Sequence, residues 1–210
     1  MQATFHYQVS TPTNMETGKT YPVLFALHGI GHNEKRMLEV FEGVKEKYIL
    51  IGIRGQLTYE NGYAFYYLKS YGNPERRLFD ESMERLQSFI EYACNKYPVD
   101  RERVHIGGFS QGAILANSLA LVLGETLKGI VSMNGYIPSF VPEDYPTKPI
   151  HHLSIFLSDG EFDQIFPPEV GKKNYEHFRN SGAAVIYKTY STDHRIIEEN
   201  KSDLTKWLLA

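Results

Sequence analysis

A five-residue turn, Gly-Phe-Ser-Gln-Gly at residues 108–112, constrains the fold of this chain more than any other feature. It fits G-x-S-x-G, a sharp turn from a strand into a helix that holds the serine hydroxyl clear of the backbone. The serine of such a turn has strained φ and ψ angles, and the crossing backbones leave no space for a Cβ atom two residues before or after it. Both glycines are therefore expected to be sterically required.

The residues around this turn supply the context that the pattern needs. Residues 103–106 predict a strand, and residues 113–123 predict a buried helix of small and apolar residues that ends at Gly124. The pentapeptide alone is a weak signal. Strand, turn and helix in this order are the context that the motif requires.

Apolar runs alternate with amphipathic segments along the rest of the chain, which predicts strands alternating with helices. The expected strands are residues 4–10, 21–27, 48–53, 103–106, 127–133, 152–157 and 184–190, and the expected helices are residues 34–47, 75–97, 113–123, 167–181 and 195–209. This order predicts one α/β domain over residues 1–210, with a mostly parallel central sheet flanked by helices on both faces.

Composition limits the partners and the compartment. A net charge of −3 gives no electrostatic reason to bind nucleic acid or an anionic membrane. The single cysteine, Cys94, cannot form an internal disulfide and is expected to be a buried, inert thiol. The first twenty residues contain no signal-peptide core, and no apolar run approaches transmembrane length. We expect a cytoplasmic protein without stable membrane insertion, as a monomer or a homodimer.

Polar residues follow several of the predicted strands where each strand ends. These are residues 28–31, Ser110, residues 159–163 and residues 193–194. Because ligands of parallel sheets gather beyond the carboxyl ends of the strands, these residues are expected to meet at one site.

A serine hydroxyl becomes a good nucleophile when a base takes its proton and an acid fixes the tautomer of that base. His194 is the best base among the eight histidines, since it follows the last strand and comes after Ser110 and the acid, the order that this topology requires. Asp163 is favoured as the acid because Gly160 lets the chain turn toward the base. Asp159 is the other candidate, but it suits a turn-forming role.

Two further groups near the site have expected roles. Acyl transfer needs two donors aimed at the developing oxyanion. The backbone N–H groups of Gln111, at the start of the helix after the turn, and of Ile30 are assigned to this oxyanion hole. Asp193 is adjacent to His194 and is expected to cap the last helix.

Four short segments, taken together and in order, resemble the phospholipase/carboxylesterase family of α/β-hydrolases, which contains small bacterial carboxylesterases and acyl-protein thioesterases. They are residues 27–31, 107–112, 160–163 and 193–194. The resemblance spans about residues 20–200 and is much more specific than any one motif. Asp193 and Ala113 depart from it, because this family commonly has glycine at both positions.

The resemblance implies a catalytic triad of Ser110, Asp163 and His194. It also implies an oxyanion hole at Ile30 and Gln111, and neither a metal nor an organic cofactor.

Residues 57–72 form an expected loop rich in tyrosine, and long loops in compact domains are often functional. Tyr63, Phe65 and Tyr66 are its expected contribution to the wall of a substrate pocket, with simple surface packing as the alternative. This wall is apolar and has no cluster of Arg or Lys, which favours neutral esters over phosphorylated or strongly anionic substrates.

Several histidines have spacings that could hold a metal, but they lack a matching set of carboxylates or cysteines. His28 is instead expected to hydrogen-bond loop backbone, and His105 to pack in the core. His151 or His152 is expected to begin a strand.

These observations predict a serine carboxylesterase that hydrolyses a small-molecule ester through an acyl-enzyme. A thioesterase or lysophospholipase acting on longer acyl chains shares the chemistry, and the depth of the pocket would distinguish it. A non-catalytic binding protein with the same fold is the alternative from another class, but it has no need of a strained serine.

Overall fold

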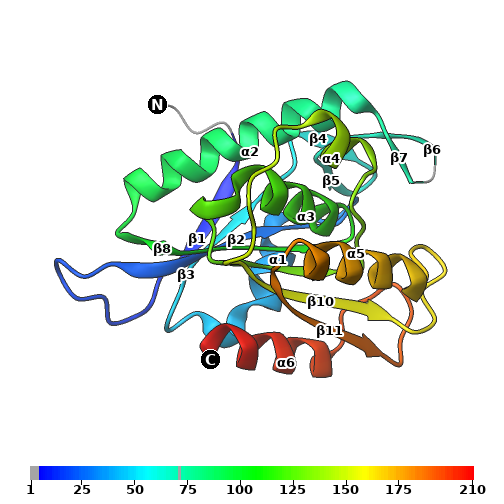
Figure 1. The fold of residues 1–210 in the computed structure, drawn as a ribbon. Helices are drawn as coiled ribbons and strands as arrows, with labels where there is room; N and C mark the ends of the chain where they lie inside the picture. The colour runs from blue at the N-terminus through cyan, green and yellow to red at the C-terminus, as the bar shows by residue number, and fades with distance from the viewer. Residues whose placement is uncertain (1–4, 71) are drawn as a thin grey trace.

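The apolar runs of the sequence form a seven-stranded sheet in the computed structural model, which describes residues 5–70 and 72–210. The strand order is β1-β3-β2-β8-β9-β10-β11 (Figure 1). Only β1 runs antiparallel to its neighbour within this sheet of the described chain. The strands are β1 Tyr7–Ser10, β2 Tyr21–Leu27, β3 Ile49–Ile53, β8 Val99–Phe109, β9 Gly129–Met133, β10 Ser154–Gly160 and β11 Ala184–Tyr190. The predicted mostly parallel sheet is confirmed.

Helices cover both faces of the sheet, as Figure 1 shows. Along β2, Val23, Phe25 and Leu27 pack into one apolar cluster, whereas Leu24 and Ala26 pack into the other. This alternation arises because successive side chains of a strand point to opposite faces. The helices are α1 Glu34–Val40, α2 Arg76–Lys96, α3 Gln111–Leu123, α4 Phe140–Asp144, α5 Pro168–Asn180 and α6 Glu198–Leu209.

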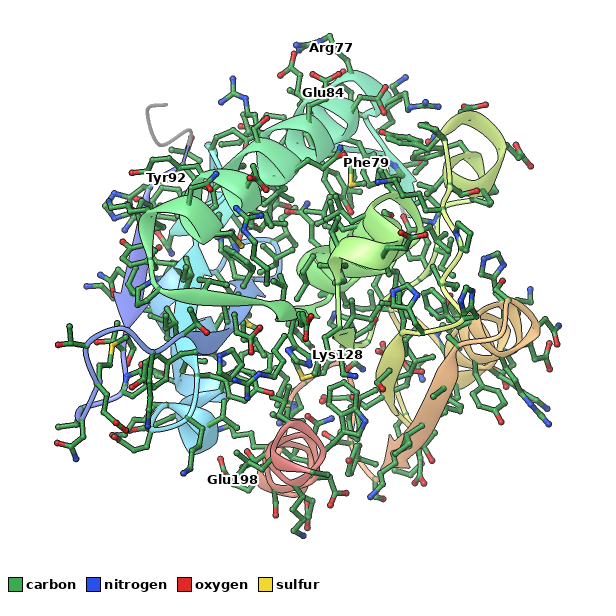
Figure 2. All side chains as sticks on the ribbon, turned by 60° about the vertical axis from the view of Figure 1, so that its left-hand side comes forward. Arg77, Phe79, Glu84, Tyr92, Lys128 and Glu198 are labelled. Carbon is green, nitrogen blue, oxygen red and sulfur yellow. The ribbon has the colours of Figure 1, made fainter. Side chains whose placement is uncertain are left out.

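The amphipathic pattern of α2 decides which of its sides faces the sheet. In α2, Phe79 points into the molecule, whereas Arg77 and Glu84 point outward (Figure 2). Side chains from α2, α3 and α5 fill one apolar cluster, and side chains from α1 and α6 fill the other. In the described ranges, no helix combines the length and the apolar character needed to cross a bilayer.

Two small hairpins lie in and next to the expected loop over residues 57–72. Strands β4 (Leu57–Tyr59) and β5 (Gly62–Ala64) form the first hairpin, and β6 (Leu68–Ser70) and β7 (Asn73–Pro74) form the second. Strands of two or three residues are too short to be recognised from an alternation of apolar and polar residues.

Other boundaries also differ from the expected ones. The predicted helix over residues 34–47 ends at Val40 and is followed by a 3₁₀ turn at Glu42–Val44. Thr4, expected in the first strand, and Tyr71, expected in the tyrosine-rich loop, lie outside the described residues.

Two expectations about buried side chains are confirmed. His105 packs in the core between Tyr48 and Trp207, with ring centroids 5.5 and 6.2 Å away. Cys94 is buried, and burial raises the pKa of its thiol to about 11, so it stays protonated at neutral pH.

Two other expectations about polar residues are wrong. Neither His151 nor His152 begins a strand, because β10 starts at Ser154. Asp159 does not form a turn: it lies inside β10, is 4% exposed, and sits against Tyr187 and α5. Burial raises the pKa of the Asp159 carboxyl to about 7.

Replacing this carboxyl by an amide tests its cost to the fold. An acid whose pKa is raised by folding destabilises the folded state progressively as pH rises from its unfolded pKa, about 4, toward its folded pKa. We therefore expect Asp159→Asn to be more stable than the wild type at pH 8, by on the order of 1–3 kcal/mol, and similar to it near pH 4. Thermal unfolding at both pH values measures the difference. An equal shift in Tm at both would contradict this account.

Candidate active site

Ser110 lies in the sharp turn between β8 and α3 with φ 53° and ψ −117°, a conformation that L residues rarely adopt. The neighbouring backbones cross closely here. A Cβ atom on Gly108 would lie 2.2 Å from the carbonyl oxygen of Gly112, and one on Gly112 would lie 2.1 Å from that of Leu27. The expected steric need for both glycines is confirmed.

A continuous chain of hydrogen bonds joins Ser110, His194 and Asp163, from three loops that follow different strands. His194 Nε2 lies 2.9 Å from Ser110 Oγ, and His194 Nδ1 lies 2.7 Å from Asp163 Oδ2. Phe109 and Phe166 pack beside the imidazole, with ring centroids 5.0 and 5.4 Å away. This arrangement can move a proton from a hydroxyl to an oriented imidazole.

Asp163 is buried, and its carboxylate accepts hydrogen bonds from three further donors besides His194. The side chain of Asn134 donates to Oδ2 at 2.8 Å, and the backbone N–H groups of Ile165 and Phe166 donate to Oδ1 at 2.7 and 2.9 Å. Burial alone would raise the pKa of Asp163, but the hydrogen bonds from His194, Asn134 and Phe166 outweigh it and lower the pKa. Asp163 therefore remains ionised at neutral pH.

Sequence reasoning missed Asn134. It follows β9 directly and has φ 53°, a left-handed conformation that asparagine tolerates better than most residues. Its position at the carboxyl end of a predicted strand was the one signal that could have found it.

Ile30 and Gln111, whose backbone N–H groups are the expected oxyanion donors, line the same cavity as Ser110. Among the residues that the structure describes, neither group has a protein acceptor. His28 fixes the loop that carries Ile30: its Nδ1–H donates to Gly29 O at 2.8 Å, and its Nε2 accepts from Gly55 N–H at 2.9 Å. Burial lowers the pKa of His28 to about 4, so the ring is neutral. The expected bonding of His28 to loop backbone is confirmed.

An apolar cavity of about 400 Å³ opens beside Ser110, and we call it the acyl cavity. Its lining is mostly apolar and aromatic: Ile30, Tyr66, Leu68, Phe109, Ile114, Tyr136, Ile165 and Phe166.

Of the three residues expected in the wall of a substrate pocket, Tyr66 lines this cavity, whereas Tyr63 and Phe65 do not. Phe65 is fully buried against His28, with ring centroids 4.8 Å apart. The guanidinium carbon of Arg54 stacks over the ring of Tyr63, 4.4 Å from the centroid of that ring. Successive side chains of an extended segment point in opposite directions, so neighbours in sequence cannot all face one cavity.

The side chain of Gln111 holds this segment in place, which sequence reasoning missed. Its Oε1 accepts from Phe65 N–H at 2.7 Å, and its Nε2 donates to Tyr66 O at 2.8 Å. Gln111 is 4% exposed, so these bonds are shielded from water.

The two departures from the family pattern have visible contacts. Asp193 does not cap the last helix, because α6 begins at Glu198 without a side-chain cap. Its carboxylate instead accepts two hydrogen bonds from the guanidinium of Arg195. Ala113 is fully buried in α3, where its Cβ lies close to Gly135.

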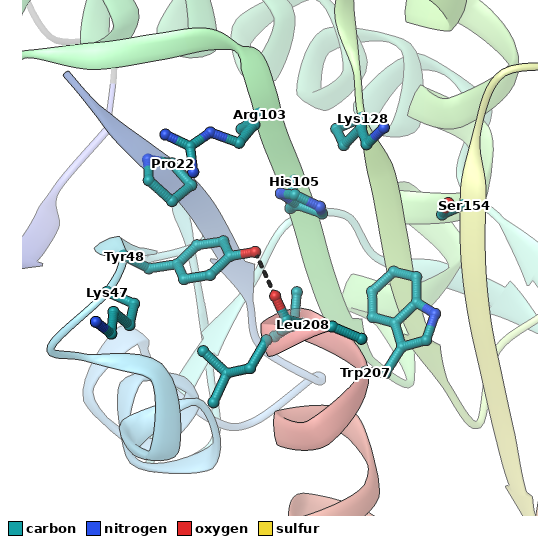
Figure 3. Close-up of a pocket in the computed structure, with 11 residues that line it drawn as sticks. Pro22, Lys47, Tyr48, Arg103, His105, Lys128, Ser154, Trp207 and Leu208 are labelled. Carbon is teal, nitrogen blue, oxygen red and sulfur yellow. Dashed lines mark hydrogen bonds between the residues drawn. The ribbon is translucent and has the colours of Figure 1, made fainter.

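A larger cavity, of about 580 Å³, lies at the other edge of the sheet (Figure 3). Its lining residues include Pro22, Lys128 and Ser154, which stand at or just before the amino ends of their strands. There the Tyr48 hydroxyl donates to Leu208 O at 2.8 Å. Ligands of parallel sheets bind at the opposite, carboxyl edge, where Ser110 lies.

Metal ligands do not gather at either edge. Over the described ranges, no group of three or more His, Cys, Asp or Glu side chains is placed to hold an ion.

Comparisons with known proteins identify the family and the fold. The sequence model of the phospholipase/carboxylesterase family matches residues 12–209. A Bacillus subtilis protein named as a hydrolase, MhqD, is 26% identical over 91% of this chain and 94% of its own length. Acyl-protein thioesterase 1 of Candida albicans is 28% identical over 72% of this chain and 71% of its own. The carboxylesterase of Bacillus cereus superposes with a TM-score of 0.86 at 23% identity, over 98% of this chain and 94% of its own.

Replacing the Gln111 side chain tests its anchoring role. In Gln111→Ala, two shielded hydrogen bonds to the backbone at residues 65–66 are lost, and each contributes about 1 kcal/mol. We expect amide exchange at Phe65 and its neighbours to speed up by about 10-fold or more, while exchange in β8 stays unchanged. Native-state hydrogen exchange measures both segments. Unchanged protection at Phe65 would contradict the anchoring role.

Proposed function

Since this chain belongs to the phospholipase/carboxylesterase family, we propose that it hydrolyses carboxylic esters with Ser110 as the nucleophile, His194 as the general base and Asp163 as the acid that orients it. One observation carries the proposal: the unbroken hydrogen-bonded chain from Ser110 Oγ through the imidazole to an ionised, buried carboxylate. In known serine hydrolases, a catalytic triad is identified by the geometry and the roles of its three residues, and not by their positions in the sequence.

The reaction follows from what each group can do. His194 Nε2 takes the proton of Ser110 as Oγ attacks the ester carbonyl carbon, and Asp163 stabilises the resulting imidazolium. The N–H groups of Ile30 and Gln111 donate to the oxyanion of the tetrahedral intermediate. His194 then gives its proton to the departing alcohol, which leaves an acyl group on Ser110. Water, deprotonated by His194, attacks this acyl-enzyme and releases the acid.

Thioester hydrolysis is a second candidate, because the same groups can expel a thiolate. Relatives in several fungi are named acyl-protein thioesterase 1. The acyl cavity is lined by apolar side chains, as an acyl chain requires. A purely binding role is disfavoured, because a strained serine and its two required glycines cost stability without serving a binding module.

Covalent labelling tests the nucleophile directly. A fluorophosphonate probe is expected to modify Ser110 stoichiometrically in the folded protein and not after heat denaturation, with the site read by mass spectrometry. Ser110→Ala should abolish labelling and lower kcat by about 10⁴–10⁶-fold, and Asp163→Asn should lower it by about 10⁴-fold. Labelling of another serine, or turnover near the wild-type rate in Ser110→Ala, would overturn the assignment.

A series of acyl lengths tests the acyl cavity. Each buried methylene contributes about 0.8 kcal/mol, so kcat/KM should rise roughly three- to four-fold per added carbon until the cavity of about 400 Å³ is full. We expect the rise to stop at a medium chain in a panel of p-nitrophenyl esters from acetate to palmitate. A rise that continues to palmitate would favour the long-chain thioesterase or lysophospholipase instead, and matched oxygen esters and thioesters then separate those two.

A further inference from the structure

We propose that a second cavity next to His194 holds the leaving group of the substrate. We further propose that Arg36 and Arg195 make this cavity specific for an alcohol or thiol that carries a carboxylate or a phosphate. The cavity measures about 460 Å³, and we call it the leaving-group cavity. The inference rests on the proposed function, since it assigns a direction to the substrate on the same nucleophile.

The position of His194 between two cavities gives the substrate its direction. His32, Phe109 and His194 line both the acyl cavity and the leaving-group cavity. Ser110 and Gln111 line only the acyl cavity. The imidazole must protonate the leaving oxygen or sulfur, so that atom lies against His194 while the carbonyl carbon lies against Ser110. The rest of the leaving group then extends past His194, into the second cavity.

The chemistry of this second cavity differs from that of the first. Among the described residues, no lysine or arginine lines the acyl cavity, whereas Arg36, Arg195 and Lys201 all line the leaving-group cavity. One carboxylate, that of Glu39, lies in the same lining. The expected absence of an Arg or Lys cluster concerns the wall formed by the tyrosine-rich loop, and it does not extend to this second cavity.

The availability of these cations decides which of them can recognise a ligand. Lys201 is paired with Glu198 at 2.6 Å. Arg36 forms no ion pair within residues 5–70 and 72–210. Arg195 uses two of its five N–H donors on Asp193 and keeps the others. A planar guanidinium presents paired donors that match the two oxygens of a carboxylate or a phosphate.

This arrangement gives Asp193 a structural role, which is to position Arg195. Two bonds to its carboxylate hold the guanidinium of Arg195, one residue beyond His194. The glycine common in the family at this position could not hold Arg195. Asp193 is therefore a positioning residue for the leaving-group cavity rather than a cap of α6.

Matched esters that differ only in charge test this specificity. The butyryl ester of 4-hydroxybenzoate carries a carboxylate on the leaving group, and the butyryl ester of methyl 4-hydroxybenzoate is its neutral counterpart. The butyryl ester of 4-hydroxyphenyl phosphate supplies the phosphate. We expect the wild type to prefer one or both anionic esters over the neutral one, through KM rather than kcat, and to lose this preference at high salt.

Arg36→Gln should lower the anionic-to-neutral ratio of kcat/KM by about 10-fold or more, as expected for the loss of a charge-assisted hydrogen bond. Arg195→Gln should lower the ratio in the same direction. Lys35→Gln is the matched control: it removes the same charge from the adjacent residue of α1, which does not line the cavity, and it should leave the ratio unchanged.

The outcomes separate this inference from the proposed function. If Ser110-dependent hydrolysis occurs but the wild type shows no preference for either anionic ester, the leaving-group assignment is wrong and the esterase stands. Equal effects of Arg36→Gln and Lys35→Gln would also overturn it, because they would show a general effect of surface charge. Absence of hydrolysis of every ester, together with absence of fluorophosphonate labelling, would overturn the proposed function itself.

Discussion

The close approach of α3 to the end of β2 is the contact on which the rest of the site depends. Gly112 lies so near the carbonyl oxygen of Leu27 that any side chain would collide with it. This contact places the first turn of α3 beside the loop that follows β2, so Gln111 and Ile30 come to line one cavity. Ser110 joins β8 to α3 with a positive φ, and its hydroxyl lies within hydrogen-bond distance of His194.

Buried polar contacts fix the groups around this turn. His28 and Gln111 both use their side chains to hold backbone, His28 within the loop after β2 and Gln111 at residues 65–66. Asn134 and two backbone donors hold Asp163 in the same way. Buried polar side chains must find partners, and satisfied networks of this kind rigidify their surroundings. The reacting groups are therefore positioned before any substrate arrives, as the proposed chemistry requires.

His194 has a different kind of neighbourhood on each side. Apolar and aromatic side chains fill the wall toward Ser110, and charged side chains gather on the side toward α1 and α6. An imidazole that passes a proton between serine and leaving group stands naturally at such a boundary. Under the proposed function, the two cavities fit an elongated substrate with an apolar acid portion and a polar alcohol or thiol portion.

The sequence by itself determined the α/β fold, the sharp turn around Ser110 and the order of the polar residues that follow the strands. These features depend on local periodicity and on the steric needs of two glycines, so short segments report them. Only the tertiary structure decided that Tyr66, and not Tyr63 or Phe65, faces the acyl cavity. It also decided that Asn134 supports Asp163, and that Arg36 and Arg195 line one cavity although 158 residues separate them along the chain. Contacts between distant segments depend on how helices and loops pack, and no local pattern of residues records that packing.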